Sequence, residues 1–321
     1  MTIPSPRSSS AGEEADVARP DLEVDVGGGL RLANPVLTAS GTFGYGLEHD
    51  GIGDVAELGG ICSKGLSLAP REGNPPERIA ETAAGMLNAI GLANVGVDAF
   101  VREKVPALRE RRATVIANVF ATSVEDFREL ARRLDGVEGV HALELNVSCP
   151  NVAHGGLEFG VDPKACGAVT RAVRDTTRLP IWVKLSPEAS DSVAVARACL
   201  DNGADAVSAI NTIRGMSVDA RTGRIRLANR TGGLSGPAIK PIALRIVWEV
   251  HRKLPELPVI GIGGISTVED AIEMLRVGAR AVQVGTASFV DPRAAWNVLD
   301  GLRAFCVAQR TTARELVGTA W

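Results

Sequence analysis

One short stretch gathers most of the side chains that could do chemistry. It reads Glu144-Leu145-Asn146-Val147-Ser148-Cys149-Pro150-Asn151 and begins as a strand. Pro150 ends that strand, because proline fixes φ and has no N–H for a ladder. Side chains alternate along a strand, so Glu144 and Asn146 share one face. A lone cysteine is most often a buried apolar residue, but Cys149 follows the strand on a polar loop, which favours a reactive thiol.

The same kind of ending recurs along the chain, where polar residues or glycines follow eight apolar runs. The runs are Pro35–Ala39, Gly60–Lys64, Thr114–Val119, Ala142–Val147, Ile181–Leu185, Ala206–Asn211, Val259–Ile262 and Ala281–Val284. Their endings are Ser40-Gly41, Lys64-Gly65, Asn118, Asn146, Lys184, Asn211-Thr212, Gly263-Gly264 and Gly285-Thr286. Because parallel barrels carry their active sites at the carboxyl ends of the strands, this series predicts one ligand site.

Helical patterns lie between most of these runs. Ser123 opens one helix, with Phe127, Leu130, Ala131 and Leu134 as its apolar stripe. Ser266-Thr267-Val268-Glu269 reads as a capping box that opens another, and Gly278 is placed to end it. Eight βα units predict an α/β fold, a (β/α)8 TIM barrel, with a doubly wound sheet as the alternative.

Several segments stand outside the repeating pattern. Residues 1–20 are rich in proline, serine and acidic residues, and we expect a disordered tail there. Leu22, Val24 and Val26 alternate before a triple glycine, which predicts an N-terminal β-hairpin. Two long insertions, Leu66 to about Leu92 and Ile213 to about Gly236, are typical of lids or binding loops at the C-terminal face. Residues 21–321 are therefore expected to form a single barrel domain.

Composition narrows the class of protein. The net charge of −3 and the absence of an apolar run long enough for a membrane span argue against nucleic-acid binding and membrane insertion. The N-terminus lacks the apolar core of a signal peptide, so we expect a cytoplasmic protein. The five cysteines are widely spaced and form no C-x-x-C pair, so we expect no zinc site and no iron–sulfur cluster held by this chain alone.

The glycine-rich strand ends indicate a phosphate site. Gly261-Ile262-Gly263-Gly264-Ile265-Ser266 departs from the dinucleotide fingerprint at its last position and lacks the acidic residue on the next strand. In barrels, the loops after strands seven and eight commonly hold a phosphate, and Gly263-Gly264 and Gly285-Thr286 occupy those places.

Polar side chains around that phosphate site favour FMN as the ligand. They are Lys64, Asn118, Asn146 and Lys184. A lysine beside flavin N1/O2 would stabilise the reduced anion, and Lys184 is the candidate. An ion pair between Lys184 and Glu144 is an alternative that is compatible with this role. Lys64 could instead be a solvated residue at a strand end.

Longer motifs in this sequence resemble the dihydroorotate dehydrogenases, from about Leu22 to the last strand. They are Asn34-Pro35-Val36-Leu37-Thr38-Ala39-Ser40-Gly41-Thr42-Phe43-Gly44, Asn88-Ala89-Ile90-Gly91-Leu92, Asn146-Val147-Ser148-Cys149-Pro150-Asn151, Asn211-Thr212 and Gly232-Gly233-Leu234-Ser235-Gly236-Pro237-Ala238-Ile239-Lys240-Pro241. Membrane-associated members have serine at the position of Cys149 and an N-terminal hydrophobic extension, which this sequence lacks. The first two motifs resemble the cytosolic, NAD-linked B type rather than the fumarate-linked A type.

The resemblance implies an FMN enzyme that oxidises dihydroorotate to orotate in pyrimidine biosynthesis. It implies Cys149 as the general base and hydride transfer to flavin N5. It assigns FMN binding to Ser40, Lys64, Gly65, Asn118, Asn146, Lys184, Ile210, Gly236, Gly263, Gly264, Gly285 and Thr286. It assigns dihydroorotate binding to Lys64, Asn88, Ala89, Ile90, Gly91, Leu92, Asn146, Asn211 and Thr212. Asparagines suit the ring amides because each side chain both donates and accepts.

The B-type resemblance also implies partners. The chain would form a homodimer and join an electron-transfer subunit carrying FAD and [2Fe–2S], giving a heterotetramer that reduces NAD. The alternatives are a fumarate-linked homodimer, a related dihydropyrimidine flavin oxidoreductase, a flavin isomerase without net redox, and a non-catalytic phosphate-binding barrel.

Overall fold

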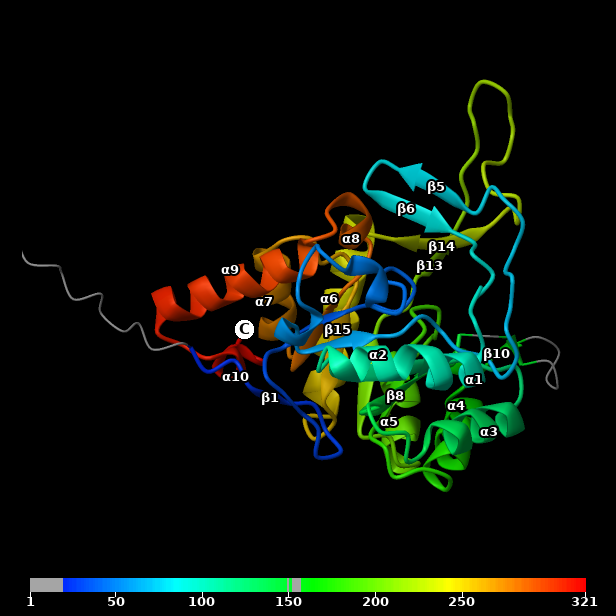
Figure 1. Ribbon diagram of the computed structural model, residues 1–321. Coiled ribbons are helices and arrows are strands. Elements are labelled where there is room, and N and C mark those ends of the chain that lie inside the picture. The colour runs from blue at the N-terminus through cyan, green and yellow to red at the C-terminus, as the bar shows by residue number, and fades with distance from the viewer. Residues whose placement is uncertain (1–19, 149, 152–156) are drawn as a thin grey trace, which may run out of the picture.

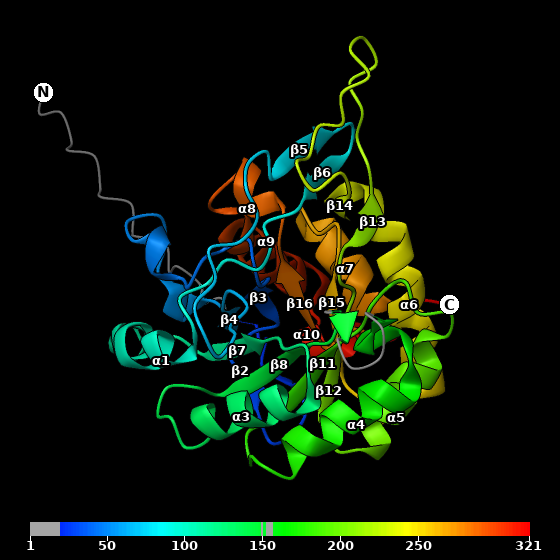
Figure 2. The ribbon, with the colours of Figure 1, turned by 90° about the vertical axis from the view of Figure 1, so that its right-hand side faces the viewer.

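Eight parallel strands close into a barrel at the centre of the computed structural model (Figure 2). In order around the barrel they are β3 (Val36–Thr38), β4 (Gly60–Cys62), β7 (Val115–Val119), β8 (Ala142–Asn146), β11 (Ile181–Lys184), β12 (Ala206–Ala209), β15 (Val259–Ile262) and β16 (Ala281–Val284). β16 pairs with β3 to complete the ring. The structure describes residues 20–148, 150–151 and 157–321, so residues 1–19 of the predicted tail and Cys149 lie outside the described residues. The predicted (β/α)8 barrel is confirmed.

Helices surround the barrel, as the alternating sequence pattern predicts (Figure 1). They are α1 (Val97–Ala99), α2 (Val105–Glu110), α3 (Val124–Leu134), α4 (Pro163–Arg174), α5 (Ser192–Asp201), α6 (Lys240–Lys253), α7 (Val268–Arg276), α8 (Ala287–Val290), α9 (Ala294–Gln309) and α10 (Ala313–Leu316). A π-helical segment, Phe100–Lys104, joins α1 to α2. Strands such as β7 and β15 are buried along their whole length. Because helices cover the outer face and side chains fill the interior, valine and isoleucine dominate these strands.

Helix caps follow the sequence with one correction. Ser123 caps α3 by accepting from the Asp126 N–H at 3.1 Å, and the predicted apolar stripe of this helix is buried. The predicted capping box of α7 was wrong by one residue. Thr267 is the N-cap, because its hydroxyl accepts from the Asp270 N–H at 3.4 Å and the Asp270 carboxylate accepts from the Thr267 N–H at 2.9 Å. The same carboxylate also accepts from the Ser266 N–H at 2.8 Å. Gly278, at φ +120°, follows the end of α7 as predicted.

The two insertions pair with each other over the C-terminal face. β5 (Ile79–Thr82) and β6 (Gly85–Asn88) come from the first, and β13 (Ile213–Gly215) and β14 (Gly232–Ser235) from the second. They form one four-stranded sheet in the order β13-β14-β6-β5, here called the lid sheet. Figure 1 shows it above the barrel, with the segment between β13 and β14 projecting farthest from the body. The two predicted lids are therefore one structure.

Short elements complete the chain. β1 (Val24–Asp25) and β2 (Arg31–Leu32) form the predicted N-terminal hairpin. β9 (Pro150–Asn151) pairs with β10 (Leu157–Glu158) directly after the fourth barrel strand. Single 3₁₀ turns span Leu47–His49, Val55–Glu57, Phe159–Val161 and Pro237–Ile239. Across the described ranges, none of the helices combines the length and apolar character needed to span a membrane.

Candidate functional site

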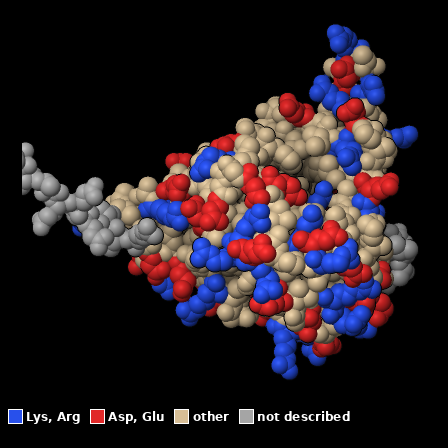
Figure 3. All heavy atoms as spheres, viewed as in Figure 1, with Lys and Arg blue, Asp and Glu red and all other residues tan. Residues whose placement is uncertain are grey.

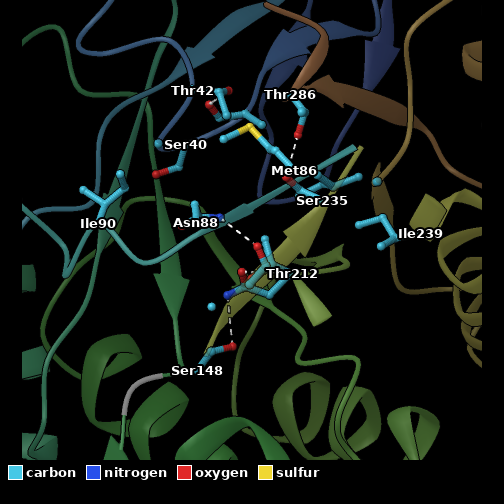
Figure 4. Close-up of a pocket in the computed structure, with 18 of the residues that line it drawn as sticks. Ser40, Thr42, Met86, Asn88, Ile90, Ser148, Thr212, Ser235, Ile239 and Thr286 are labelled. Carbon is cyan, nitrogen blue, oxygen red and sulfur yellow. Dashed lines mark hydrogen bonds between the residues drawn. The ribbon is translucent and has the colours of Figure 1, made fainter. Parts of the chain in front are cut away.

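A cavity of about 530 Å³ lies between the carboxyl ends of the barrel strands and the lid sheet. Its volume falls within the range of small-molecule sites. Barrel residues such as Lys64 and Asn146 form one wall, and Met86 of β6 and Ser235 of β14 lie on the lid side. Figure 4 shows these lid residues projecting toward the strand ends across the cavity. The space-filling view shows a hollow beside the projecting lid segment (Figure 3).

Every sequence-predicted binding residue lines this single cavity. The set comprises Ser40, Lys64, Gly65, Asn88, Ala89, Ile90, Gly91, Leu92, Asn118, Asn146, Lys184, Ile210, Asn211, Thr212, Gly236, Gly263, Gly264, Gly285 and Thr286. The predicted base, Cys149, is outside the described residues, but its neighbour Ser148 lines the cavity. Residues from both ends of the chain therefore meet at one site, as the barrel topology requires.

Beneath the cavity, a buried carboxylate joins several strands. Glu144 of β8 is fully buried and lies 3.5 Å from the Lys184 ammonium on β11. Asn118 donates to Glu144 Oε1 at 2.7 Å, and Gln283 donates to Oε2 at 2.8 Å. Burial alone would raise the pKa of Glu144, but the Lys184 charge and these hydrogen bonds outweigh it and hold the pKa below its usual value. The alternative considered for Lys184, an ion pair with Glu144, is confirmed.

Asparagines from two strand ends form a second polar group. Asn211 Nδ2 donates to Asn146 Oδ1 at 3.1 Å and to Ser148 Oγ at 3.0 Å. The Thr212 N–H in turn donates to Asn211 Oδ1 at 2.8 Å. Both ends of the Asn211 amide are thus engaged within the protein. The carbonyl of Asn146 is therefore also engaged within the protein.

At the far end of the cavity, glycines allow the chain to come close. Gly264 has φ +72°, and a Cβ there would lie 2.5 Å from Lys240 Cβ, so a side chain cannot fit. Lys240 bridges Asp270 at 2.6 Å and Glu273 at 2.9 Å. Because Asp270 already accepts from the Ser266 and Thr267 N–H groups just before α7, an anion would find its donors among the turns that end β15 and β16.

Polar contacts fasten the lid sheet to the barrel and join its two insertions to each other. Thr286 Oγ1 donates to Ser235 Oγ at 2.8 Å, and Asn88 Nδ2 donates to the Gly233 carbonyl at 3.2 Å (Figure 4). Ser148, Thr42 and Met86 also line the cavity without having been predicted. Ser148, Thr42 and Ser235 lie inside the quoted motifs, which was the available signal. Met86 lies outside those motifs, and nothing in the sequence marked it as a site residue.

Glutamates and an arginine stand at the rim. Arg214 of β13 pairs with Glu158 of β10 at 3.0 Å, and the Arg214 N–H donates to Glu188 at 2.9 Å. Burial raises the pKa of Glu158, against the lowering effect of Arg214. This group ties the lid sheet to the hairpin that follows residue 149.

Comparison with known proteins gives a consistent answer. Residues 22–306 match a sequence model of the family described as dihydroorotate dehydrogenase. A protein of Geobacter metallireducens named dihydroorotate dehydrogenase B (NAD(+)), catalytic subunit, is 52% identical over 94% of this chain and 98% of its own length. One of the same name from Geobacter sulfurreducens is 56% identical over 87% of this chain and 91% of its own length.

A solved structure shares the fold. DHODH from Eimeria tenella, in complex with ferulenol, superposes with a TM-score of 0.78 at 22% identity, covering 97% of this chain and 91% of that one. The resemblance of the motifs, the cavity that gathers them and the match over most of the length agree. The chain belongs to the dihydroorotate dehydrogenase family of oxidoreductases, and its similarity is to the NAD-linked B-type catalytic subunits.

Proposed function

We propose that this chain oxidises (S)-dihydroorotate to orotate in de novo pyrimidine biosynthesis, using bound FMN, and that its electrons reach NAD through a partner subunit. The observation that carries the proposal is that every predicted FMN and dihydroorotate residue with a described position lines one cavity. Membership of the family and the names of the most similar relatives support it.

The donors and acceptors of the cavity suit FMN. Lys184, whose ammonium pairs with Glu144, and Asn118 both line the cavity and would face the flavin. Gly263, Gly264, Gly285 and Thr286 would hold the phosphate through backbone N–H groups. When bound, FMN would supply the hydride acceptor, its N5 atom taking the hydrogen from C6 of dihydroorotate.

The chain's own residues would bind and orient the substrate. Lys64 lines the cavity, where its ammonium would pair with the dihydroorotate carboxylate. Asn146 would donate to a ring carbonyl, with Asn211 holding its amide in place. Segment 88–92, with Thr212, would close over the ring and exclude water.

Cys149 would act as the general base that removes the proton from C5. This assignment depends on the motif and on the position of Ser148 in the cavity wall. A free thiol has a pKa near 8.5, so only about a few per cent is thiolate at pH 7. Activity should therefore rise with pH.

The reaction needs an electron acceptor. We infer a partner that carries FAD and [2Fe–2S], arranged as two copies of each subunit around a homodimer of this chain. The name catalytic subunit, carried by the relatives, supports a partner. Its place on this chain would be α8, because Phe289 lines the cavity yet is 55% exposed and Val290 is 88% exposed. Ile79 of the lid sheet continues this apolar surface around the mouth.

An anaerobic titration of the purified chain tests the proposal. FMN absorbance should be present and should bleach on addition of dihydroorotate but not dihydrouracil. Absence of flavin would instead favour the alternative of a non-catalytic phosphate-binding barrel. Bleaching by dihydrouracil alone would make the chain a different pyrimidine oxidoreductase.

A further inference from the structure

A buried charge pair lies at the boundary between the cavity and the barrel interior. The Lys184 side chain is 8% exposed and that of Glu144 is fully buried. Lys184 lines the cavity, whereas Glu144 is absent from its wall. The lysine therefore faces the ligand while its counter-charge stands behind it. An ammonium this deeply buried stays protonated only if a nearby negative charge offsets its lost hydration.

The Glu144 carboxylate also determines how a second wall residue is turned. It accepts from Asn118 Nδ2 at 2.7 Å, which occupies the donor end of that amide. Asn118 is 1% exposed, and its Oδ1 atom has no partner among the described residues. A Cβ on Gly65, another wall residue, would lie 2.9 Å from this oxygen. The hydrogen bond to Glu144 therefore fixes which end of the Asn118 amide is turned toward Gly65.

The groups around Glu144 show which charge it balances. Among the described residues, the titratable groups in direct contact with Glu144 of β8 are Lys184 from β11 and Cys62 from β4. Cys62 Sγ donates to Glu144 Oε1 at 3.2 Å, and burial, then the Glu144 charge, raises the pKa of that thiol. β7, β12 and β16 contribute the neutral Asn118, Ser208 and Gln283. Glu144 is the only one of these groups that can balance Lys184.

We propose that Glu144 is a positioning residue for the flavin: its carboxylate holds the positive charge of Lys184 at the cavity wall and fixes the orientation of the Asn118 amide. This inference rests on the proposed binding of FMN in the cavity. A cation already present at the wall balances the negative charge that bound FMN would gain on reduction. Two-electron reduction of bound FMN should then take up one proton. Without the Glu144 counter-charge to hold that cation in advance, reduction should take up two.

The number of protons can be read from the midpoint potential of bound FMN as a function of pH. One proton per two electrons gives a slope of about 30 mV per pH unit, and two protons give about 59 mV. The titration uses the FMN-loaded chain, a chemical reductant and no dihydroorotate. We expect the one-proton slope in the unmodified protein and the two-proton slope in Glu144→Gln.

Two variants serve as controls. Glu144→Asp retains the charge and should restore the one-proton slope. Cys62→Ala removes a neighbour of Glu144 without changing the charge of Glu144. This variant should therefore also show the one-proton slope. Equal slopes in the unmodified protein and Glu144→Gln would overturn the inference while leaving FMN binding intact. Failure of the unmodified chain to bind FMN would instead refute the proposed function.

A second measurement covers the case in which Glu144→Gln does not fold. Adding Lys184→Met removes the unpaired ammonium together with its lost partner. If the double variant folds and melts at a higher temperature than Glu144→Gln alone, the defect arises from the lysine charge, as the inference requires. If the double variant is no better, Glu144 does not act through Lys184 and the inference fails.

Discussion

Asn211 holds Asn146 in place through a hydrogen bond of 3.1 Å between Nδ2 and Oδ1, which joins the ends of β8 and β12 across the cavity wall. Because Asn211 Nδ2 also donates to Ser148, both of its protons are used inside the protein. The orientation of the Asn146 amide thus depends on Asn211 being a donor.

We expect Asn211→Asp to weaken dihydroorotate binding more than Asn211→Ala. The aspartate would place a second acceptor against Asn146 Oδ1 and a negative charge near an anionic substrate. A lost hydrogen bond between half-buried groups costs about 0.5–1.5 kcal/mol, so KM should rise roughly two- to twelve-fold. Steady-state kinetics with a dye acceptor measure this. Equal KM values for both variants would show that Asn211 does not orient Asn146.

Cys149→Ala should leave FMN bound but slow flavin reduction by dihydroorotate about 10²- to 10⁴-fold, as expected for loss of a general base. Cys149→Ser should retain part of the activity, shifted to higher pH because a hydroxyl is a weaker acid. Stopped-flow reduction at several pH values measures both effects. Reduction by the alanine variant at the unmodified rate would assign the base elsewhere.

Lys64→Ala should weaken dihydroorotate binding and also FMN retention, since one ammonium is proposed to serve both. Charge-assisted hydrogen bonds are worth about 1.5–3 kcal/mol, which corresponds to roughly ten- to 150-fold in Kd. Lys164→Ala, at an exposed lysine outside the cavity, is the matched control. If both variants behave alike, Lys64 is a solvated residue at a strand end.

The stability of the protein should depend on pH through Glu144. Its folded pKa lies below the unfolded value, so its stabilising effect is complete above the unfolded pKa and is lost as pH falls through the folded one. Glu144→Gln should therefore destabilise the chain by about 3–5 kcal/mol at neutral pH, with a smaller difference in acid. Denaturant unfolding at neutral and acidic pH tests this. A gap that widens in acid would contradict it.

Much of the architecture follows from the sequence because it is local. Eight apolar runs, each closed by a polar residue or glycine, predicted both the barrel and the face that carries the site. The Asn88–Gly233 contact shows what was out of reach. These residues are 145 positions apart, and the glycine-rich β14 has little strand propensity, so only the folded barrel brings the two insertions together.

The exact N-cap of α7 and the contacts of Glu144 could not be predicted from the sequence either. The N-cap of α7 lies one residue after the predicted position. Asp270 accepts from the N–H groups of both Ser266 and Thr267, and residue spacing alone does not decide which of the two is the N-cap. The role of Glu144 as a junction of several strands was hidden for a similar reason. Its partners Asn118 and Gln283 come from β7 and β16, far apart in the sequence, and only barrel closure points them at one carboxylate.

The last prediction concerns the path of electrons out of the cavity. If the partner docks on α8, Val290→Asp should reduce NAD-linked turnover in the presence of the electron-transfer subunit. Turnover of the lone chain with a dye should not change, because Val290 is outside the cavity lining. A charge placed in the apolar centre of an interface weakens association, whereas one at a remote site does not. Val307→Asp on α9, also at an exposed apolar residue, is the control.

Two results would contradict this arrangement. Equal loss of NAD-linked turnover in both variants would mean that α8 is not the docking surface. Steady turnover of the lone chain with fumarate, at a rate comparable to that with the dye, would remove the need for a partner and identify the fumarate-linked homodimer instead. NAD reduction by the lone chain would also show that no partner subunit is needed. Measuring dye, fumarate and NAD side by side, with and without the second subunit, separates the electron acceptor from the surface that reaches it.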